Sequence, residues 1–245
     1  MNDLNAKWGV ITNGIIWRLY ADNIPSDQYI EINLKNKELN ELWTFFSKES
    51  FKKLDALLKE STEYKVQLSE NLGREIFEKV FPKLSKGFRE NCDNLDEIYS
   101  NVLILLYRLL ILFHLEDREL IPITDVSLRK ISNLKVGEKT TLIYDNLLNL
   151  FHIINEGDKT LGYRAYNGGL FNPEQYIFLE KNKIRDVYMK EVLNILGRYD
   201  YSEFSVKHLG SIYEAILDYK LKEENNEIYL VKENNSRKFA GIYYT

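Results

Sequence analysis

The chain has 245 residues, of which 44% are hydrophobic and 29% are charged, and these proportions are ordinary for a globular protein of one large or two modest domains. Its net charge of −4 argues against a wholly basic nucleic-acid coat, although one face can still be basic. The single cysteine, Cys92, excludes an intrachain disulfide, and the first ten residues lack the pattern of a signal peptide. We expect a cytoplasmic protein.

Residues 8–34 predict a small β-sheet. The segment 8–20, WGVITNGIIWRLY, has two β-prone runs on either side of Thr12-Asn13-Gly14, and Asn-Gly tolerates the positive φ of a hairpin turn. The segment 29–34, YIEINL, alternates enough to be a third strand. Because three strands alone make a poor domain, we expect them to be the edge of a sheet whose other strands lie outside this chain.

From Lys37 onward the apolar residues recur at helical spacing. Pro82 is expected to end or kink one helix, and Gly157 to stop another. Residues 161–171 form a glycine-bearing loop with buried aromatics, and residues 221–231 predict a hairpin around Glu224-Asn225-Asn226. Besides a central helix, the predicted helices cover residues 39–46, 51–58, 61–88, 140–154, 184–196 and 206–219.

The segment 101–120, NVLILLYRLLILFHLEDREL, is the most apolar run in the chain. Arg108 in its middle makes it a poor membrane span, because an Arg at the bilayer centre costs at least about 2.5 kcal/mol. A helix that is apolar nearly all round and lies outside a membrane is a central helix wrapped by others. We predict a mainly α fold, a helical bundle around residues 101–120, with a short three-strand element at the N-terminus and a small β element at the C-terminus.

A dense charge cluster, Glu116-Asp117-Arg118, follows the central helix. Arg108 precedes Arg118 by ten residues, which places it roughly 80° away around a helix, so it does not pair with the cluster directly. We therefore expect a capped, solvated helix end and, apart from it, a buried Arg108 with its own partner.

No self-contained catalytic set is visible in the sequence. His114, His152 and His208 lie on separate predicted helices without metal-ligand spacing, and nothing activates the thiol of Cys92. We therefore assign no catalytic residue and no metal ligand in this segment.

Three motifs resemble functional signatures only superficially. Asp55 with Glu63-Tyr64-Lys65 matches a D…ExK nuclease pattern, but that chemistry needs these groups to converge on a metal from adjacent strands, and the surrounding spacing is helical. Asn172-Pro173-Glu174 lacks the second Pro and the aromatic of an amino-methyltransferase loop, which favours a helix-initiating Asn-Pro. Asn167-Gly168-Gly169 lacks the Lys of a phosphate loop, which favours a structural turn.

Five segments together resemble a known family. They are WGVITNGIIWRLY, LYRLLILFHLEDRELIP, AYNGGLF, HLGSIYEAILDYKL and RKFAGIYYT. In this order and at comparable spacing, they are similar to segments of type IIG restriction–modification enzymes and the related phage-exclusion, adenine-specific DNA methyltransferases. The resemblance covers nearly the whole chain.

In that family a PD-(D/E)xK nuclease domain is followed by a helical connector, an N6-adenine methyltransferase domain and a target-recognition domain. The resemblance implies that residues 1–35 are the closing strands of a truncated nuclease-like domain, residues 36–220 the helical connector, and residues 221–245 the opening of a missing methyltransferase domain. It also implies that Tyr243, Tyr244 and Thr245, which match the family's Gly-x-Tyr-Tyr-Thr-Pro segment, contact S-adenosylmethionine in the full enzyme.

The family's metal-binding strands, cofactor loop and Asn-Pro-Pro-aromatic motif are absent from this sequence. We therefore expect neither activity from this segment alone and no cofactor bound to it, since S-adenosylmethionine and Mg²⁺ belong to the full-length family. The expected function is to space a nuclease and a methyltransferase module, with those modules and DNA as partners and no membrane. Candidate contacts to DNA phosphates are Lys7, Arg18, Arg237 and Lys238, although an exposed solubilising charge is the simpler interpretation of each.

Two other hypotheses remain open. One is a non-enzymatic helical interaction module that docks a separate methyltransferase through apolar surface near Trp8, Trp17 and Tyr243. The other is a standalone nuclease built on Asp55, Glu63 and Lys65, which would have to meet around a metal.

Overall fold

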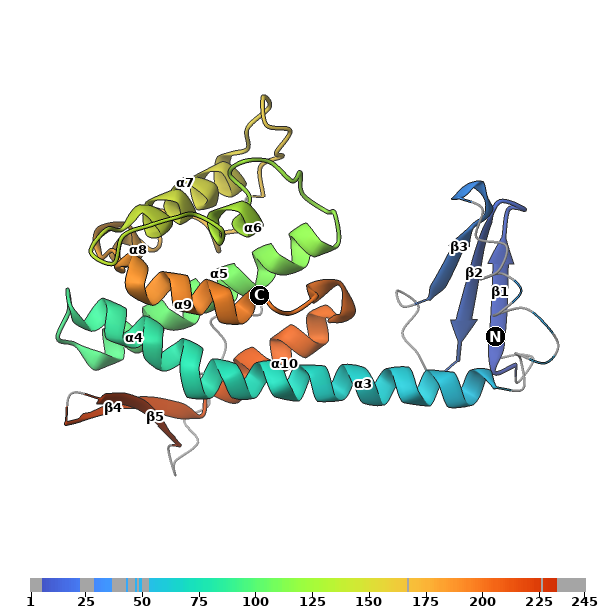
Figure 1. Ribbon diagram of the computed structural model, residues 1–245, viewed down its shortest axis with the longest axis horizontal. Helices are drawn as coiled ribbons and strands as arrows, with labels where there is room; N and C mark the ends of the chain where they lie inside the picture. The colour runs from blue at the N-terminus through green and yellow to red at the C-terminus, as the bar shows by residue number, and fades with distance from the viewer. Residues whose placement is uncertain are drawn as a thin grey trace. The chain divides into compact units, whose positions relative to one another are not determined.

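The computed structural model describes residues 6–22, 29–36, 43, 47, 49, 53–166, 168–225 and 227–232. The chain divides into two compact units, residues 1–64 and residues 65–245. Helices predominate among the described residues, with a small antiparallel sheet toward each end, which confirms the predicted fold class (Figure 1). The elements are β1 (Trp8–Thr12), β2 (Ile16–Ala21), β3 (Ile30–Asn33), η2 (Leu34–Asn36), α3 (Leu54–Glu75), η3 (Ile76–Val80), α4 (Phe81–Arg89), α5 (Leu95–Asp117), α6 (Leu128–Ile131), α7 (Leu142–Glu156), α8 (Ile177–Lys181), α9 (Asp186–Leu196), η4 (Tyr201–Glu203), α10 (Val206–Ile216), β4 (Tyr219–Glu224) and β5 (Glu227–Lys232).

The predicted N-terminal hairpin is present in the first unit. Strands β1, β2 and β3 form an antiparallel sheet in that order, with Thr12 paired to Trp17 across the turn. The Asn13 side chain accepts hydrogen bonds from the backbone N–H groups of Ile15 and Ile16, at 3.0 and 2.8 Å, and Gly14 takes a φ of 87°. The turn therefore depends on the Asn-Gly pair that predicted it.

The described part of this sheet buries little apolar surface. Its buried hydrophobic residues are Leu19, Ala21 and Ile32. Among the described strands, β1 lies at an edge of the sheet, and its Val10 and Ile11 are exposed, with Ile11 64% exposed. An apolar edge strand of this kind is open to pairing with a further strand.

The helical segment before α5 changes its geometry directly before Pro82, where we expected an end or a kink. Helix α3 ends at Glu75, and the wider π-type turn η3 carries the chain into α4, with Phe81 N–H donating to the carbonyl of Ile76. Proline has no N–H to donate and its ring crowds the carbonyl four residues earlier. A π-type turn directly before Pro82 relieves that crowding without ending the helical path.

Helix α5 is the central helix, but it runs over residues 95–117 rather than 101–120. It begins at Leu95 because the Asn94 side chain accepts from the N–H groups of Asp96 and Glu97. It ends after Asp117 because Glu119 adopts a φ of 56° and Leu120 N–H turns back to the carbonyl of Leu115.

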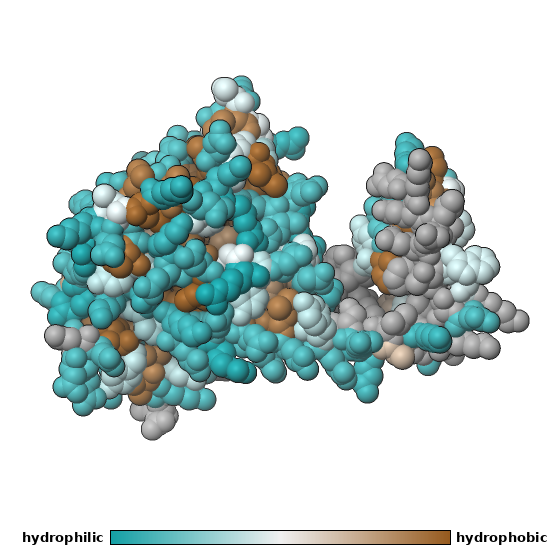
Figure 2. Space-filling model, viewed as in Figure 1, coloured by the Kyte–Doolittle hydropathy of each residue, from teal (hydrophilic) through white to brown (hydrophobic). Residues whose placement is uncertain are grey.

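In Figure 1, α5 runs through the middle of the helical unit, with α4, α6 and α10 packed against it. By length and composition it could cross a membrane, yet 67% of its most apolar stretch is buried inside the protein. That burial is the signature of a core helix. On the face drawn in Figure 2, the surface of the helical unit is mainly hydrophilic, with small scattered apolar patches.

Several of the turns and loops predicted outside α5 are also present in the structure. Gly157 ends α7 with a φ of 81°, and a Cβ there would lie 2.8 Å from the backbone N of Ala165. Tyr163 and Phe171 of the glycine-bearing loop are buried, and β4 and β5 form the predicted C-terminal hairpin. The short helix α6 was not expected, and its position depends on a contact from α5.

Candidate functional site

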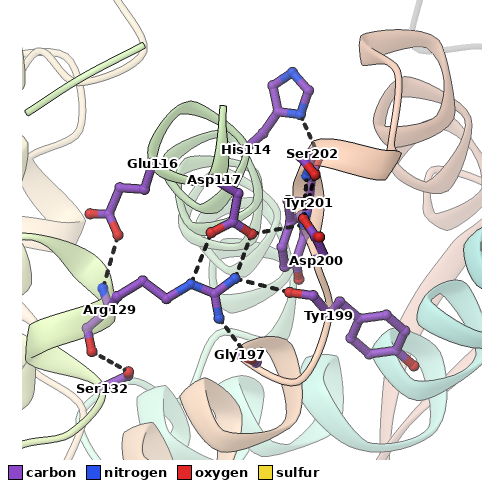
Figure 3. Close-up of polar contacts among 10 residues, drawn as sticks. All are labelled: His114, Glu116, Asp117, Arg129, Ser132, Gly197, Tyr199, Asp200, Tyr201 and Ser202. Carbon is purple, nitrogen blue, oxygen red and sulfur yellow. Dashed lines mark hydrogen bonds and ion pairs between the residues drawn. The ribbon is translucent and has the colours of Figure 1, made fainter. Parts of the chain in front are cut away.

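The C-terminal end of α5 carries a cluster of polar groups that face inward (Figure 3). The Glu116 side chain is buried, and its two carboxylate oxygens accept from the backbone N–H groups of Leu128 and Arg129 at the start of α6. Burial raises the pKa of this carboxyl. The expectation of a solvated helix end is therefore wrong for Glu116, because α6 packs over it.

Asp117 forms the second contact of this cluster. It pairs through both oxygens with the Arg129 guanidinium and also accepts from the N–H of Tyr201 at 2.8 Å. Arg129 donates further to the carbonyls of Gly197 and Tyr199, at 2.6 and 2.9 Å. One guanidinium thus joins α5, α6 and the segment after α9 (Figure 3).

His114 and Arg118 complete the cluster. The Nδ1 atom of His114 lies 3.0 Å from the carbonyl oxygen of Tyr201, which can only accept, so Nδ1 carries the proton and donates. Burial lowers the pKa of His114, which keeps the imidazole neutral near pH 7. Arg118 donates to the carbonyls of Ser202 and Phe204. These contacts hold backbone segments together. They also occupy the carboxylate and imidazole groups of this cluster, which acid–base chemistry would need.

Arg108 is the other buried charge on α5. It is fully buried, and its Nε donates to the carbonyl of Leu170 at 2.8 Å. Its Cζ lies 4.8, 5.6 and 5.0 Å from the ring centroids of Phe151, Phe171 and Tyr176. The prediction of a buried Arg108 with a partner is confirmed for this one nitrogen and for the three rings.

The two Nη atoms of Arg108 differ from its Nε in their hydrogen bonding. Among the described residues they have no hydrogen-bond partner. Burial lowers the pKa of Arg108 to about 10, so the group stays charged near pH 7. Burying an unpaired ion costs several kcal/mol, and a desolvated cation–π contact offsets roughly 2 kcal/mol.

Glu180, on α8, shares this environment. Its negative charge acts against the lowering of the Arg108 pKa by burial. Its Oε2 lies 3.0 Å from Nε2 of His152, whereas its Oε1 is buried without a hydrogen-bond partner among the described residues. Arg108 and Glu180 are thus two incompletely satisfied groups of opposite charge on neighbouring helices.

Asp186 is a buried acid that the sequence reasoning missed. Its carboxylate accepts from the N–H groups of Leu142 and Ile143 at 2.9 and 2.8 Å, and from the hydroxyl of Thr140. It therefore caps the start of α7 from a distant part of the chain. The sequence carries no signal for this contact, because Thr is itself a favoured N-cap residue and only the structure shows that Thr141 makes no side-chain cap.

Of the residues proposed to contact DNA, the structure describes Lys7 and Arg18. Lys7 is exposed just before β1. The Nε of Arg18 lies 2.6 Å from Glu31, and its Cζ lies 4.6 Å from the ring centroid of Tyr29. The charge of Arg18 is therefore already partnered. The remaining site residues proposed from the sequence, Arg237, Lys238, Tyr243, Tyr244 and Thr245, lie outside the described residues.

The superficial nuclease pattern lies on helix α3, which carries Asp55, Glu63 and Lys65. Glu63 lies 3.8 Å from Lys59, and Lys65 lies 3.5 Å from Glu203. Glu63 and Lys65 are thus engaged with different partners, as expected for charges on a helix surface.

The other motifs form turns and caps. The Asn172 side chain accepts from the N–H of Glu174, but α8 begins only at Ile177, so this Asn-Pro makes a turn and does not initiate the helix as we expected. Gly169, with a φ of 78°, forms the expected structural turn. His208 takes part in the capping box of α10 with Ser205. Within the described ranges, no group of three or more His, Cys, Asp or Glu side chains could hold a metal ion.

Comparisons with protein-family models, with curated proteins and with solved structures find no match. The function is therefore inferred from the geometry of the described residues and from the resemblance of the five segments.

Proposed function

We propose that this chain is the helical connector of an adenine-specific restriction–modification DNA methyltransferase of the type IIG kind. In this proposal it works in the cytoplasm and holds a nuclease module and a methyltransferase module at a fixed spacing on DNA. Residues 1–35 would complete the nuclease-like domain, residues 36–220 would be the connector, and residues 221–245 would lead into the methyltransferase.

The observation that carries the proposal is the way α5 is fixed at both ends. Asn94 caps its first turn, while Asp117 and Arg118 join its last turn to the segment 201–204. A spacer has to keep its length and direction when the modules at its ends are loaded. A long buried helix with a capped first turn and a last turn tied to a neighbouring segment meets that requirement.

The exposed apolar edge of β1 also supports the proposal. A strand with Val10 and Ile11 exposed is expected where further strands of a larger domain pair with it. In the full enzyme, Mg²⁺ would belong to that nuclease domain. S-adenosylmethionine would belong to the methyltransferase, with Tyr243, Tyr244 and Thr245 beside it.

The first test concerns the modules. The coding sequence beside this chain should contain a frame with a glycine-bearing cofactor loop and an Asn-Pro-Pro-aromatic motif. When the two polypeptides are co-expressed, size-exclusion chromatography should show a stable complex that methylates adenine in duplex DNA. A neighbouring frame of that kind that neither binds this chain nor needs it for methylation would contradict the connector role.

The second test concerns phosphate contacts. Binding of the full chain to a random DNA duplex should weaken with salt, and Lys7→Gln should reduce the log–log slope by about 0.9 if Lys7 neutralises one phosphate. Glu31→Gln, which releases Arg18 from its ion pair, should strengthen binding, whereas Lys59→Gln serves as a surface control. A slope near zero would remove DNA contacts from the proposal and leave only the spacing role.

An alternative is a non-enzymatic interaction module that docks a separate methyltransferase. The exposed Val10, Ile11 and Ile15 favour it. We expected the dock near Trp8, Trp17 and Tyr243; Trp8 and Trp17 are only partly exposed, and Tyr243 lies outside the described residues. Under this alternative, Ile11→Lys should abolish capture of the methyltransferase but leave the thermal stability of the helical unit unchanged.

A further inference from the structure

We propose that the Arg108 guanidinium is an internal binding site for a small oxyanion, a phosphate or carboxylate group. The site would be formed by α5, α7 and the segment 168–176. This inference is independent of the connector function, because it rests only on contacts inside the helical unit.

The argument starts from geometry. Arg108 is fully buried, one of its nitrogens donates to Leu170, and both Nη atoms have no hydrogen-bond partner among the described residues. Two neighbouring N–H groups of a guanidinium match the two oxygens of a carboxylate or phosphate in a bidentate pair. The unused side of this guanidinium is therefore the part that recognises oxyanions.

The surroundings select for a small ligand. The rings of Phe151, Phe171 and Tyr176 lie around the guanidinium and leave it buried, so a duplex DNA backbone cannot reach it. Carbon-rich walls also strengthen an ion pair, because they exclude the water that would screen it.

The segment 168–176 covers part of the Arg108 guanidinium. Its own hydrogen bonds include those from Asn172 N–H to Gly169 and from Glu174 N–H to the Asn172 side chain. The Arg108–Leu170 bond and the ring contacts attach it to the core. A ligand that takes over the guanidinium would loosen this attachment, so amide hydrogen exchange in residues 168–171 should change when the ligand binds.

The test uses the full chain and inorganic phosphate. Thermal unfolding is followed at pH 7.5 while sodium phosphate replaces sodium chloride at constant ionic strength, with sodium acetate as a parallel titration. The wild-type midpoint should rise and saturate. Arg108→Lys keeps the positive charge but cannot form a bidentate pair, so saturation should need about tenfold more phosphate. Arg108→Met should abolish the saturable rise, and Arg164→Met, which removes an exposed Arg from the neighbouring loop, should retain it.

The phosphate and acetate titrations together identify the chemical class of the ligand. A response to phosphate alone indicates a phosphate-bearing ligand, a response to acetate alone indicates a carboxylate-bearing ligand, and a response to both supports the shared oxyanion chemistry. Amide exchange in residues 168–171 should follow the same titration. The proposal is overturned if the wild type shows no saturable response or if Arg108→Lys binds as well as the wild type. A loss of the response in Arg164→Met equally rejects it, since the anion then binds at the surface.

Discussion

At the scale of single residues, Arg129 is the main polar link of the helical unit. Its guanidinium pairs with Asp117 and donates to two backbone carbonyls in the segment after α9. Its Cζ also lies 4.8 Å from the ring centroid of Phe113, so part of its charge is shielded from water. If the Asp117 carboxylate is removed, the half-buried Arg129 guanidinium keeps only backbone carbonyls as its partners.

Asp117→Asn should therefore destabilise the fold by about 1–3 kcal/mol, the usual effect of leaving a buried donor unsatisfied. The measurement is the free energy of unfolding in urea. Asp93→Asn is the matched control, because Asp93 also pairs with an arginine but its side chain is 94% exposed, and it should cause almost no change. An equal loss in the free energy of unfolding for the two substitutions would show that the contacts drawn in Figure 3 do not stabilise the fold.

Glu116 gives a prediction about pH. Burial raises its pKa above the ordinary value of 4.5, so the folded protein binds this proton more tightly than the unfolded chain does. The stabilising contribution of the protonated group is fully present below that value and is lost as the pH rises through the folded pKa. Wild-type stability should therefore fall more steeply with rising pH above about 4.5 than the stability of Glu116→Gln.

Urea denaturation at a series of pH values measures both slopes. At neutral pH the same Gln variant should still be less stable than the wild type by about 1–3 kcal/mol, since its amide can no longer accept from both N–H groups of α6. Parallel slopes for the two proteins would show that Glu116 does not titrate differently in the folded state.

At the scale of elements, α4 fits closely against the segment that leads into α9. Gly87 on α4 has no side chain, and a Cβ built there would lie 2.5 Å from Cγ2 of Ile184, which is itself fully buried. This glycine allows the close approach, although glycine is a poor helix former.

Gly87→Ala should therefore destabilise the protein by about 1–3 kcal/mol, because overpacking outweighs the gain in helix propensity. Gly210→Ala on α10 should do the opposite and stabilise it by up to about 1 kcal/mol, since nothing lies within 4 Å of its added Cβ. Thermal unfolding of both variants measures the contrast. A stabilising Gly87→Ala would mean that Ile184 can move aside without loss.

At the scale of the whole molecule, burial is distributed unequally between the two units. The large apolar cluster runs from Leu72 to Ile228 and lies within residues 65–245. The described part of the first unit buries only three apolar residues in a three-stranded sheet. Small sheets of that size are marginal when isolated in water.

A fragment of residues 54–245, which keeps all of α3, should therefore unfold cooperatively, with a midpoint within a few degrees of the full chain. A fragment of residues 1–64 should show no cooperative transition. Circular dichroism during heating distinguishes the two fragments. A cooperative transition in residues 1–64 would show that the β unit does not need further strands.

Much of the fold was accessible from the sequence. Helical spacing located most helices, Asn13-Gly14 located the hairpin turn, and Pro82 marked the break before α4. Less of the candidate sites could be predicted from the sequence. The sequence indicated a buried Arg108 with a partner, but it could not show which of its nitrogens would be satisfied or that Phe151, Phe171 and Tyr176 would surround it.

The sequence by itself determined what depends on near neighbours. Periodicity, caps and turns involve residues a few positions apart, so α5 could be recognised as the central helix from its own composition. Only the tertiary structure decided the environment of the charges. Glu116 is paired with a backbone 12 residues away, Asp186 with one 43 residues away, and Arg108 with one 62 residues away. Whether a charge is solvated or buried depends on which distant segments pack over it, and that packing cannot be deduced from the local pattern.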